Sequence, residues 1–285
     1  MSVPLHGFQR EAMATSFEVI IAESAEVDAL YAAQAAEAVF EEILRLEDEL
    51  SRFRQGSYIW QLNQLSAGQS LNVSLATWDC LSLAKTMFEE SDGAFDITIG
   101  PLMHLWRTED GSLREPDPER LALARASIGS QLFDLDETNL TVTLKADHMV
   151  FDLGAVGKGY ALDQAASILD QWGVGNALLN AGDSTLLALG QPPGEDAWGV
   201  TLADGAQAMT LKDRALSGSG FMVKGAHIMN PRTLRPVAIQ VQRSYALAPS
   251  AALSDALSTA FMVMEPTEVE ALCGKYAGLV EAVWV

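Results

Sequence analysis

The pattern of hydrophobic and polar positions predicts several helices along the chain. Between residues 27 and 53, Val39, Ile43, Leu46 and Leu50 recur at helical spacing, and acidic residues occupy the other faces. Such a one-sided apolar stripe is typical of a helix that packs against a core. Further helices are expected at 75–91, at 159–172 with an end at Gly173, and at 250–264 with Ser250 as the N-cap.

Shorter apolar or alternating runs predict strands between and after these helices. The runs lie at 13–22, 139–145, 148–153, 176–180, 184–189, 197–202, 236–244 and 278–285. Those at 139–145 and 148–153 suggest a hairpin, while the polar, proline-containing stretch 108–121 is typical of a loop. Strands come in groups and do not alternate strictly with helices, which favours an α+β fold. No clean linker divides residues 1–285, so a single domain is expected.

Composition and charge exclude several classes of protein. With 285 residues, 49% hydrophobic and 20% charged, the chain is that of an ordinary globular protein. The balance of 18 basic against 38 acidic residues gives a net charge of −20, which argues against nucleic acid and anionic membranes as partners. Cys80 and Cys273 are too few for a disulfide framework and are expected to be buried thiols.

No segment of the sequence is expected to anchor the chain in a membrane or export it. No apolar run reaches the ~18 residues that a membrane span requires. The N-terminal residues show no cationic start followed by an apolar stretch. The expected compartment is therefore the cytoplasm, or the periplasm if an export signal has been trimmed.

The densest chemical signal lies between a predicted strand and a predicted helix, from Asp152 to Tyr160. Its glycines and Lys158 suit an anion, because glycines expose backbone N–H groups, a helix N-terminus carries positive partial charge, and a lysine can reach a phosphate oxygen. The spacing matches neither a Walker A loop nor a dinucleotide fingerprint. A turn that merely contains glycines is the alternative interpretation.

A second signal is a pair of polar side chains in the apolar helix predicted at 250–264. Asp255 and Thr259 are four residues apart, so both oxygens share one helix face. A carboxylate and a hydroxyl, completed by backbone carbonyls and water, suit Mg²⁺. A pair that faces solvent is the alternative.

Two further segments complete the candidate chemistry: 217–220, made of glycines and serines, and 227–231, which contains a histidine. His227 lies beside a turn predicted at Asn230-Pro231. A lone histidine is more often a surface or satisfied core residue than a catalyst, so His227 alone predicts no activity.

Together and in this order, the segments resemble the ApbE family of FAD:protein FMN transferases. The motifs that carry the resemblance are Met13-Ala-Thr15, Ser51-Arg-Phe53, Gly93-Ala-Phe-Asp-Ile-Thr-Ile-Gly-Pro-Leu102, Asp152-Leu-Gly-Ala-Val-Gly-Lys-Gly-Tyr160, Gly218-Ser-Gly220, His227-Ile-Met-Asn-Pro231 and Asp255-Ala-Leu-Ser-Thr259. They extend from residue 13 to about residue 264, nearly the whole chain. The resemblance implies an α+β fold of the T-fold type.

The resemblance also implies a reaction and a set of site residues. It implies Mg²⁺-dependent transfer of FMN from FAD to a serine or threonine hydroxyl of an acceptor flavoprotein, with release of AMP. It places Asp255, Thr259, the Ala155 carbonyl and Ser258 at Mg²⁺, and His227 in the catalytic role. The residues that it places at FAD are Met13, Phe53, Ala94, Phe95, Asp96, Asp152, Lys158 and Met229.

Several positions depart from the family pattern and leave the activity open. Ala14 and Gly218 stand where a glycine and a threonine are usual, Asn230 replaces an aspartate, and Ala181-Gly-Asp183 replaces two glycines and an asparagine. An active transferase, a protein that binds FAD without transferring FMN, and a pyrophosphatase that hydrolyses FAD to FMN and AMP are the three functions considered.

Overall fold

The computed structural model describes residues 4–108, 112–182, 184–202, 207–220, 228–237 and 243–284. Its largest element is a 7-stranded sheet in which every neighbouring pair is antiparallel. The strands, in spatial order, are β1 (Leu5–Ala12), β2 (Thr15–Ala22), β6 (Ala177–Ala181), β7 (Thr185–Leu189), β10 (Arg214–Gly220), β13 (Arg243–Ala248) and β14 (Glu281–Trp284).

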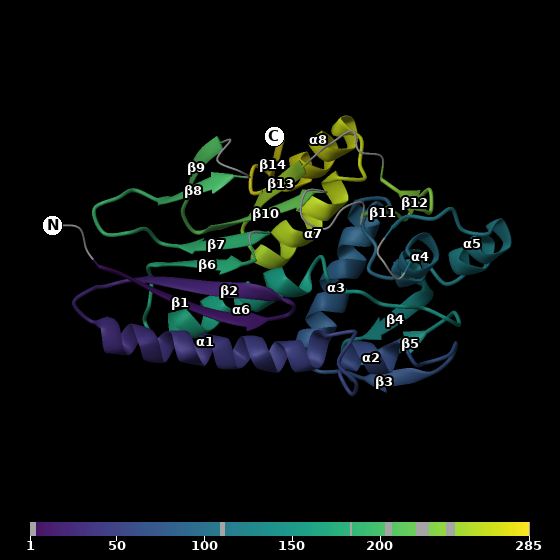
Figure 1. Cartoon of the computed structure of the whole chain (residues 1–285), viewed down its shortest axis with the longest axis horizontal. Helices are drawn as coiled ribbons and strands as arrows, with labels where there is room; N and C mark the ends of the chain where they lie inside the picture. The colour runs from purple at the N-terminus through teal and green to yellow at the C-terminus, as the bar shows by residue number, and fades with distance from the viewer. Residues whose placement is uncertain are drawn as a thin grey trace.

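Three helices cover one face of this sheet (Figure 1): α1 (Ala29–Leu50), α6 (Gly157–Gln171) and α7 (Ala251–Phe261). The inward residues of β2, among them Phe17, Val19 and Ile21, pack in one cluster with the buried stripe of α1. The stripe predicted from Val39, Ile43, Leu46 and Leu50 is therefore confirmed. Ser250 caps α7 as predicted, since its hydroxyl accepts the Leu253 N–H at 3.2 Å.

The opposite face of the sheet is covered by the hairpin of β8 (Trp198–Leu202) and β9 (Gln207–Leu211). Trp198, Val200 and Leu211 pack there against Leu216 of β10 and Tyr245 of β13. Residues of β10 and β13 thus alternate between the helix-covered face and this second apolar cluster.

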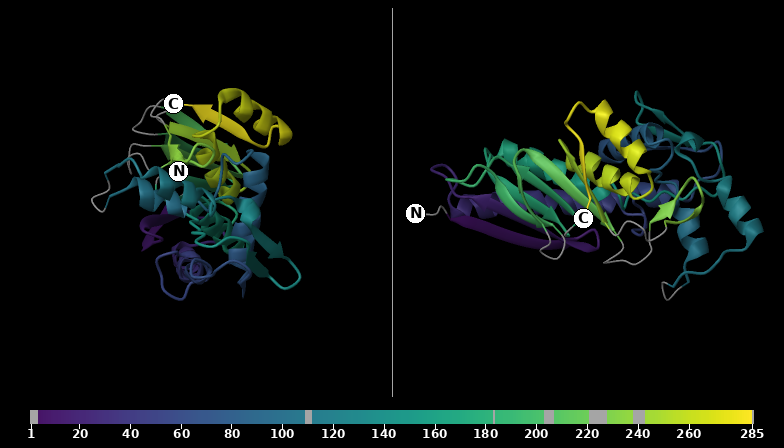
Figure 2. Two further views of the ribbon diagram at one scale, coloured as in Figure 1. Left: turned by 90° about the vertical axis from the view of Figure 1, so that its right-hand side faces the viewer. Right: turned by 90° about the horizontal axis from the view of Figure 1, so that it is seen from above.

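The other end of the elongated molecule is built from smaller elements (Figures 1 and 2). A 3-stranded sheet pairs β3 (Ser70–Asn72), β5 (Thr141–Leu144) and β4 (Phe133–Asp136). Around it lie α2 (Tyr58–Leu62), α3 (Leu75–Glu90), α4 (Gly100–Trp106), α5 (Pro118–Arg125), the 3₁₀ turn η1 (Ser130–Leu132) and the pair β11 (Met229–Asn230) and β12 (Arg235–Pro236). Helix α8 (Pro266–Lys275) precedes β14. Within the described residues, no helix is long and apolar enough to cross a membrane.

The predicted α+β class is confirmed, but the predicted hairpin of 139–145 with 148–153 is wrong. Strand β5 pairs with β3 and β4 instead. The segment 148–153 runs beside 97–100, where Val150 bridges Ile99 and the Asp152 N–H donates to the Ile97 carbonyl at 2.7 Å. Met149, Phe151 and Leu153 alternate because they point into the core, which imitates a strand pattern.

Other element boundaries also differ from the prediction. The loop expected at 108–121 ends early, because Asp117 caps α5, accepting the Glu119 N–H at 2.8 Å and the Arg120 N–H at 3.2 Å. The strand expected at 236–244 is displaced to β13, while residues 238–242 lie outside the described part of the chain. Cys80 is buried as expected, whereas Cys273 is partly exposed.

Candidate functional site

Asp255 of α7 meets the first turn of α6 at the centre of the molecule. The Asp255 side chain is 6% exposed, and its carboxylate lies 3.5 Å from the Lys158 ammonium. It also accepts the Gly159 N–H at 3.4 Å. Lys158 donates to the Gly154 carbonyl at 2.8 Å, so the glycine loop and the carboxylate share one cation. The alternative of a solvent-facing Asp255 is therefore wrong.

Gly159 allows the two helices to approach this closely. A Cβ atom at this position would lie 2.2 Å from the Ala251 carbonyl oxygen and 2.7 Å from the Ala252 Cα. Both are backbone atoms of α7, so no rotamer change could relieve the clash. Gly159 is required by the crossing of α6 and α7, which brings Lys158 to Asp255.

A seam of hydroxyl groups lies between α7 and the sheet. Ser219 of β10 is 2.9 Å from the Ser258 hydroxyl and 3.1 Å from the Thr259 hydroxyl. Ser258 also donates to the Asp255 carbonyl at 2.9 Å, and its own carbonyl accepts from Ser244 at 2.7 Å. Ser219 therefore joins the strand to the two hydroxyl-bearing residues that follow Asp255.

This group of oxygens suits a magnesium ion. Asp255 supplies a buried carboxylate, and Thr259 and Ser258 supply hydroxyls. Ala155 lies in the loop just before α6, the helix whose first turn carries Lys158. Hard oxygen ligands, few carboxylates and substrate phosphates are what Mg²⁺ typically uses. The described residues contain no group of three or more His, Cys, Asp or Glu side chains that could hold a metal ion by themselves. A magnesium ion here would rely on hydroxyl, carbonyl and phosphate oxygens beside one carboxylate.

Asp152 organises the start of the glycine loop. One of its carboxylate oxygens accepts the Gly154 N–H at 2.9 Å, and the other lies 3.2 Å from the Arg52 guanidinium. That guanidinium stacks 4.3 Å from the centre of the Phe53 ring, and the Phe53 side chain is 80% exposed. An exposed aromatic ring held by a cation is free to stack on a planar ligand.

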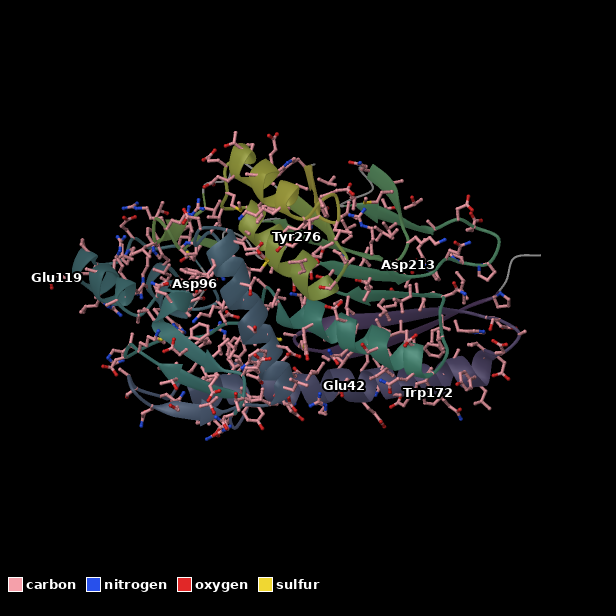
Figure 3. All side chains as sticks on the ribbon, turned by 180° about the vertical axis from the view of Figure 1, so that it is seen from behind. Glu42, Asp96, Glu119, Trp172, Asp213 and Tyr276 are labelled. Carbon is pink, nitrogen blue, oxygen red and sulfur yellow. The ribbon has the colours of Figure 1, made fainter. Side chains whose placement is uncertain are left out.

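The segment 93–98 lies between α3 and α4, and Figure 3 shows Asp96 between α3 and α5. Ala94 and Phe95 are buried in the core. One Asp96 oxygen accepts from the Thr98 N–H at 2.9 Å, the Thr98 hydroxyl at 2.8 Å and the Ser130 hydroxyl at 3.0 Å. The other oxygen is buried without a partner, and burial raises the pKa of this carboxyl.

A cavity of about 270 Å³ opens beside Asp96. Arg125 and Arg232 line it together with Gly93, Gln131 and Pro231. An unpartnered buried acceptor is costly unless a ligand satisfies it. The cavity therefore offers a hydrogen-bond acceptor to a bound molecule, and Arg125 contributes a cationic side chain to its lining.

The segment 228–237 forms the other wall of this cavity. Met229 is buried against α4 residues such as Leu102 and Trp106, and so contributes packing. The Asn230 side-chain oxygen accepts the N–H groups of Arg232 and Thr233, at 2.9 and 3.1 Å. An aspartate would accept the same two bonds, so Asn230 retains this turn. His227 lies outside the described residues.

Arg232 ties this segment to two helices. Its guanidinium donates to the Ser91 and Asp92 carbonyls at 2.7 and 2.9 Å, and to Glu268 of α8 at 2.9 Å. The contacts of Arg232 were not predictable from the sequence, although Arg232 directly follows the His-Ile-Met-Asn-Pro motif. The role of Ser219 was not predicted either, although this residue is the centre of the Gly-Ser-Gly motif.

Met13 lies at the same end of the sheet as Ser219. One residue from each of β2, β6, β7, β10 and β13 lies in a single row across the sheet. These residues are, in that order, Phe17, Ala181, Thr185, Ser217 and Ala246. Three segments lie just beyond this row, at one end of the sheet: the β1–β2 turn, the β6–β7 turn and the last residues of β10.

Glycine at position 182 is required there. A Cβ atom on Gly182 would lie 1.6 Å from the Thr15 hydroxyl oxygen, and its φ is +59°. The β6–β7 turn therefore packs directly against the first residue of β2, close in sequence to Met13.

The departure at Gly218 points away from Asp255. A Cβ atom on Gly218 would lie 2.6 Å from the Tyr245 ring, its cross-strand neighbour. Tyr245 belongs to the cluster under β8 and β9, whereas the adjacent Ser219 contacts α7. A side chain at position 218 would therefore point toward the Tyr245 ring, on the face of the sheet opposite Asp255.

Curated relatives extend over most of the chain. The FAD:protein FMN transferase of Escherichia coli strain K12 is 26% identical over 267 residues, covering 86% of this chain and 75% of the relative. An enzyme of the same name from Klebsiella pneumoniae strain 342 is 33% identical over 219 residues, covering 71% and 66%.

Solved structures and the family model agree with these relatives. The apo flavinyl transferase ApbE of Pseudomonas stutzeri matches with a TM-score of 0.86 at 25% identity, covering 99% of this chain and 92% of that one. The ApbE protein of Thermotoga maritima matches with a TM-score of 0.84 at 26% identity, covering 99% and 94%. The ApbE family model matches residues 13–284. Because the motifs, the fold and the family model agree, the chain belongs to the ApbE family.

Proposed function

We propose that this protein is a Mg²⁺-dependent FAD:protein FMN transferase that modifies a serine or threonine hydroxyl of an acceptor flavoprotein and releases AMP. The observation that carries the proposal is the buried Asp255 carboxylate, in contact with Lys158 and next to the Ser258 and Thr259 hydroxyls. The names of the relatives support the transfer of FMN from FAD to a protein. Neither Asn230, which holds its own turn, nor Gly218, which faces Tyr245, removes an atom from this group.

The reaction needs a nucleophile, charge neutralisation and a leaving group. The acceptor hydroxyl oxygen forms a bond to the FMN phosphorus of FAD, the bond from that phosphorus to the bridging oxygen breaks, and AMP leaves with that oxygen. When bound, Mg²⁺ supplies neutralisation of the pyrophosphate charge, and Asp255, Thr259, Ser258 and the Ala155 carbonyl would hold it. Lys158, already beside Asp255, would contribute positive charge to the phosphates.

The proposed FAD contacts fall into two groups. Phe53 offers its exposed ring, and Asp152 and Lys158 offer polar atoms beside the glycine loop. Asp96 offers its unpartnered oxygen to an N–H donor, which the adenine amino group could satisfy. Ala94, Phe95 and Met229 have buried side chains, so they would act through the backbone or as packing, and Met13 would act from the β1–β2 turn.

We assign the proton transfer to His227. An unperturbed imidazole, with a pKa of about 6.5, can accept the hydroxyl proton at neutral pH. His227→Ala should lower turnover by about 10²–10⁴, the usual contribution of a positioned general base, with FAD affinity nearly unchanged. A histidine that only packs beside Pro231 would instead lower the melting temperature and leave turnover per folded molecule intact.

The decisive experiment is incubation with FAD, Mg²⁺ and a candidate flavoprotein, followed by the intact mass of the acceptor. Transfer adds one FMN less one water to the acceptor and releases AMP. Free FMN and AMP with an unmodified acceptor would indicate a pyrophosphatase, and bound, unchanged FAD would indicate a binding protein. Either result, obtained with an acceptor that a known relative modifies, would contradict the proposal.

Asp255→Ala tests the metal site within the same assay. The variant should lose Mg²⁺-dependent transfer, because it lacks the one carboxylate of the proposed metal site. It should remain folded, because alanine is smaller than aspartate and fits in the same space. Asp170→Ala removes an exposed carboxylate of α6 and is the matched control. Equal transfer by Asp255→Ala and the parent would remove Asp255 from the site.

A further inference from the structure

We propose that Asp163 is a positioning residue, which fixes α7 against α6 and so sets the placement of Asp255 beside Lys158. This inference rests on the proposed function, because the helix that Asp163 holds is the one carrying the proposed Mg²⁺ ligands. Asp163 lies on α6 and is not part of the metal group itself. Its effect is transmitted through the backbone of α7.

The contact is made with the first amides of α7. One Asp163 oxygen accepts the Ala251 N–H at 2.7 Å, and the other accepts the Ala252 N–H at 2.9 Å. The first N–H groups of a helix have no partner within the helix, and a carboxylate is favoured there by the helix dipole. Ser250 already caps the Leu253 N–H, so the aspartate satisfies two further donors from a different helix.

Asp163 and Gly159 act on the same stretch of α7. They are four residues apart on α6 and therefore share a helix face. Gly159 lets the Ala251 backbone approach, since a Cβ atom there would meet the Ala251 carbonyl at 2.2 Å. Gly159 thus sets how near α7 comes, and Asp163 sets its position along and around its axis.

Asp255 lies one helical turn beyond the two amides that Asp163 holds. The Lys158–Asp255 distance of 3.5 Å and the Gly159–Asp255 distance of 3.4 Å are both longer than ideal charged hydrogen bonds. A small rotation of α7 would therefore separate the carboxylate from α6. Asp163→Asn tests this directly, because an amide keeps the size but offers only one acceptor to two N–H donors.

Two measurements on the whole chain of residues 1–285 test the proposal. Asp163→Asn should speed hydrogen exchange of the Ala251 and Ala252 amides by about tenfold or more, because each hydrogen bond to a charged group is lost or weakened. It should also weaken Mg²⁺ binding, titrated by calorimetry with FAD present, by about tenfold, and saturating Mg²⁺ should restore turnover. The exposed Asp170→Asn on the same helix is the control and should match the parent in both measurements.

The outcomes separate this inference from the proposed function. Unchanged exchange at Ala251 and Ala252, or unchanged Mg²⁺ affinity per folded molecule, would overturn the role of Asp163. Faster exchange throughout the molecule would show a general loss of stability and would also overturn it. A parent protein that binds no Mg²⁺ would refute the proposed metal site, whereas the exchange result would still decide whether Asp163 holds α7.

Discussion

At the scale of single residues, the β1–β2 turn combines two unfavourable backbone conformations. Met13 and Ala14 have φ angles of +50° and +57° in a two-residue hairpin loop between Ala12 and Thr15. Such a loop favours Asn-Gly, because both central residues are left-handed. Ala14 therefore adopts a conformation that the family's glycine adopts without strain.

Ala14→Gly should stabilise the protein by about 0.5–1 kcal/mol, since relief of left-handed strain exceeds the added entropy of the unfolded chain. Denaturant unfolding would measure the change. Ala208→Gly, at an exposed position of β9 with ordinary φ, is the control and should be destabilising. A loss of stability in Ala14→Gly would show that the alanine methyl makes a contact that outweighs the strain.

Asp163 also gives the protein a specific dependence on pH. Burial raises the pKa of this carboxyl from 3.8 to about 6, against the opposing effect of hydrogen bonds from the Ala252 and Ala251 amides and the Ser250 side chain. The Asp163 carboxyl therefore binds a proton more tightly in the folded protein than in the unfolded chain. The stability that this group contributes is complete below pH ~4 and is lost as the pH rises through 6.

Asp163→Asn lacks this titration. The unfolding free energy of the parent minus that of the variant should fall by about 3 kcal/mol between pH 4 and 7. Denaturant unfolding of both proteins across this range isolates the group, because other titrations cancel in the difference. A difference that stays constant, or that rises with pH, would contradict the raised pKa.

At the scale of elements, the α6–α7 crossing determines the candidate site. Gly157 and Gly159 lie in the same first turn of α6, but only Gly159 faces the backbone of α7. A Cβ atom on Gly157 would meet Leu153 at an ordinary 3.7 Å. The two glycines therefore provide a matched pair of substitutions.

Gly159→Ala should destabilise the protein by about 1–3 kcal/mol, because α7 must move to admit the methyl group. Gly157→Ala should instead stabilise it by up to about 1 kcal/mol, since alanine is the better helix former. Thermal or denaturant unfolding distinguishes the two, and Gly159→Ala should also lower FMN transfer. Equal effects of both substitutions would mean that the close approach of the helices does not constrain position 159.

At the scale of the whole molecule, the net charge of −20 opposes the binding of anionic FAD. The screening length falls from roughly 30 Å at 0.01 M salt to about 8 Å at 0.15 M. Without Mg²⁺, FAD association should therefore become faster as salt is raised, measured by stopped-flow flavin fluorescence. A rate that falls with salt would show that the local cations Arg125 and Arg232 outweigh the net charge.

The sequence by itself determined the features that depend on local periodicity and on motif order. The stripe of α1, the cap at Ser250 and the group of strands and helices that gives an α+β fold all follow from neighbours in the chain. The family was also predictable, because its motifs retain their order even where Ala14, Gly218 and Asn230 differ. Strand partners were not predictable in this way: 148–153 alternates like a strand because its apolar residues enter the core beside 97–100.

Only the tertiary structure decided which side chains meet. That Gly218 faces Tyr245 while Ser219 faces Thr259 depends on the register of β10 and β13. The tie from Asp163 to the start of α7 joins residues 88 positions apart, and the Asp255–Lys158 contact depends on the same helix crossing. Spacing along one helix can place two oxygens on one face, but the partner of that face is set by packing between distant segments.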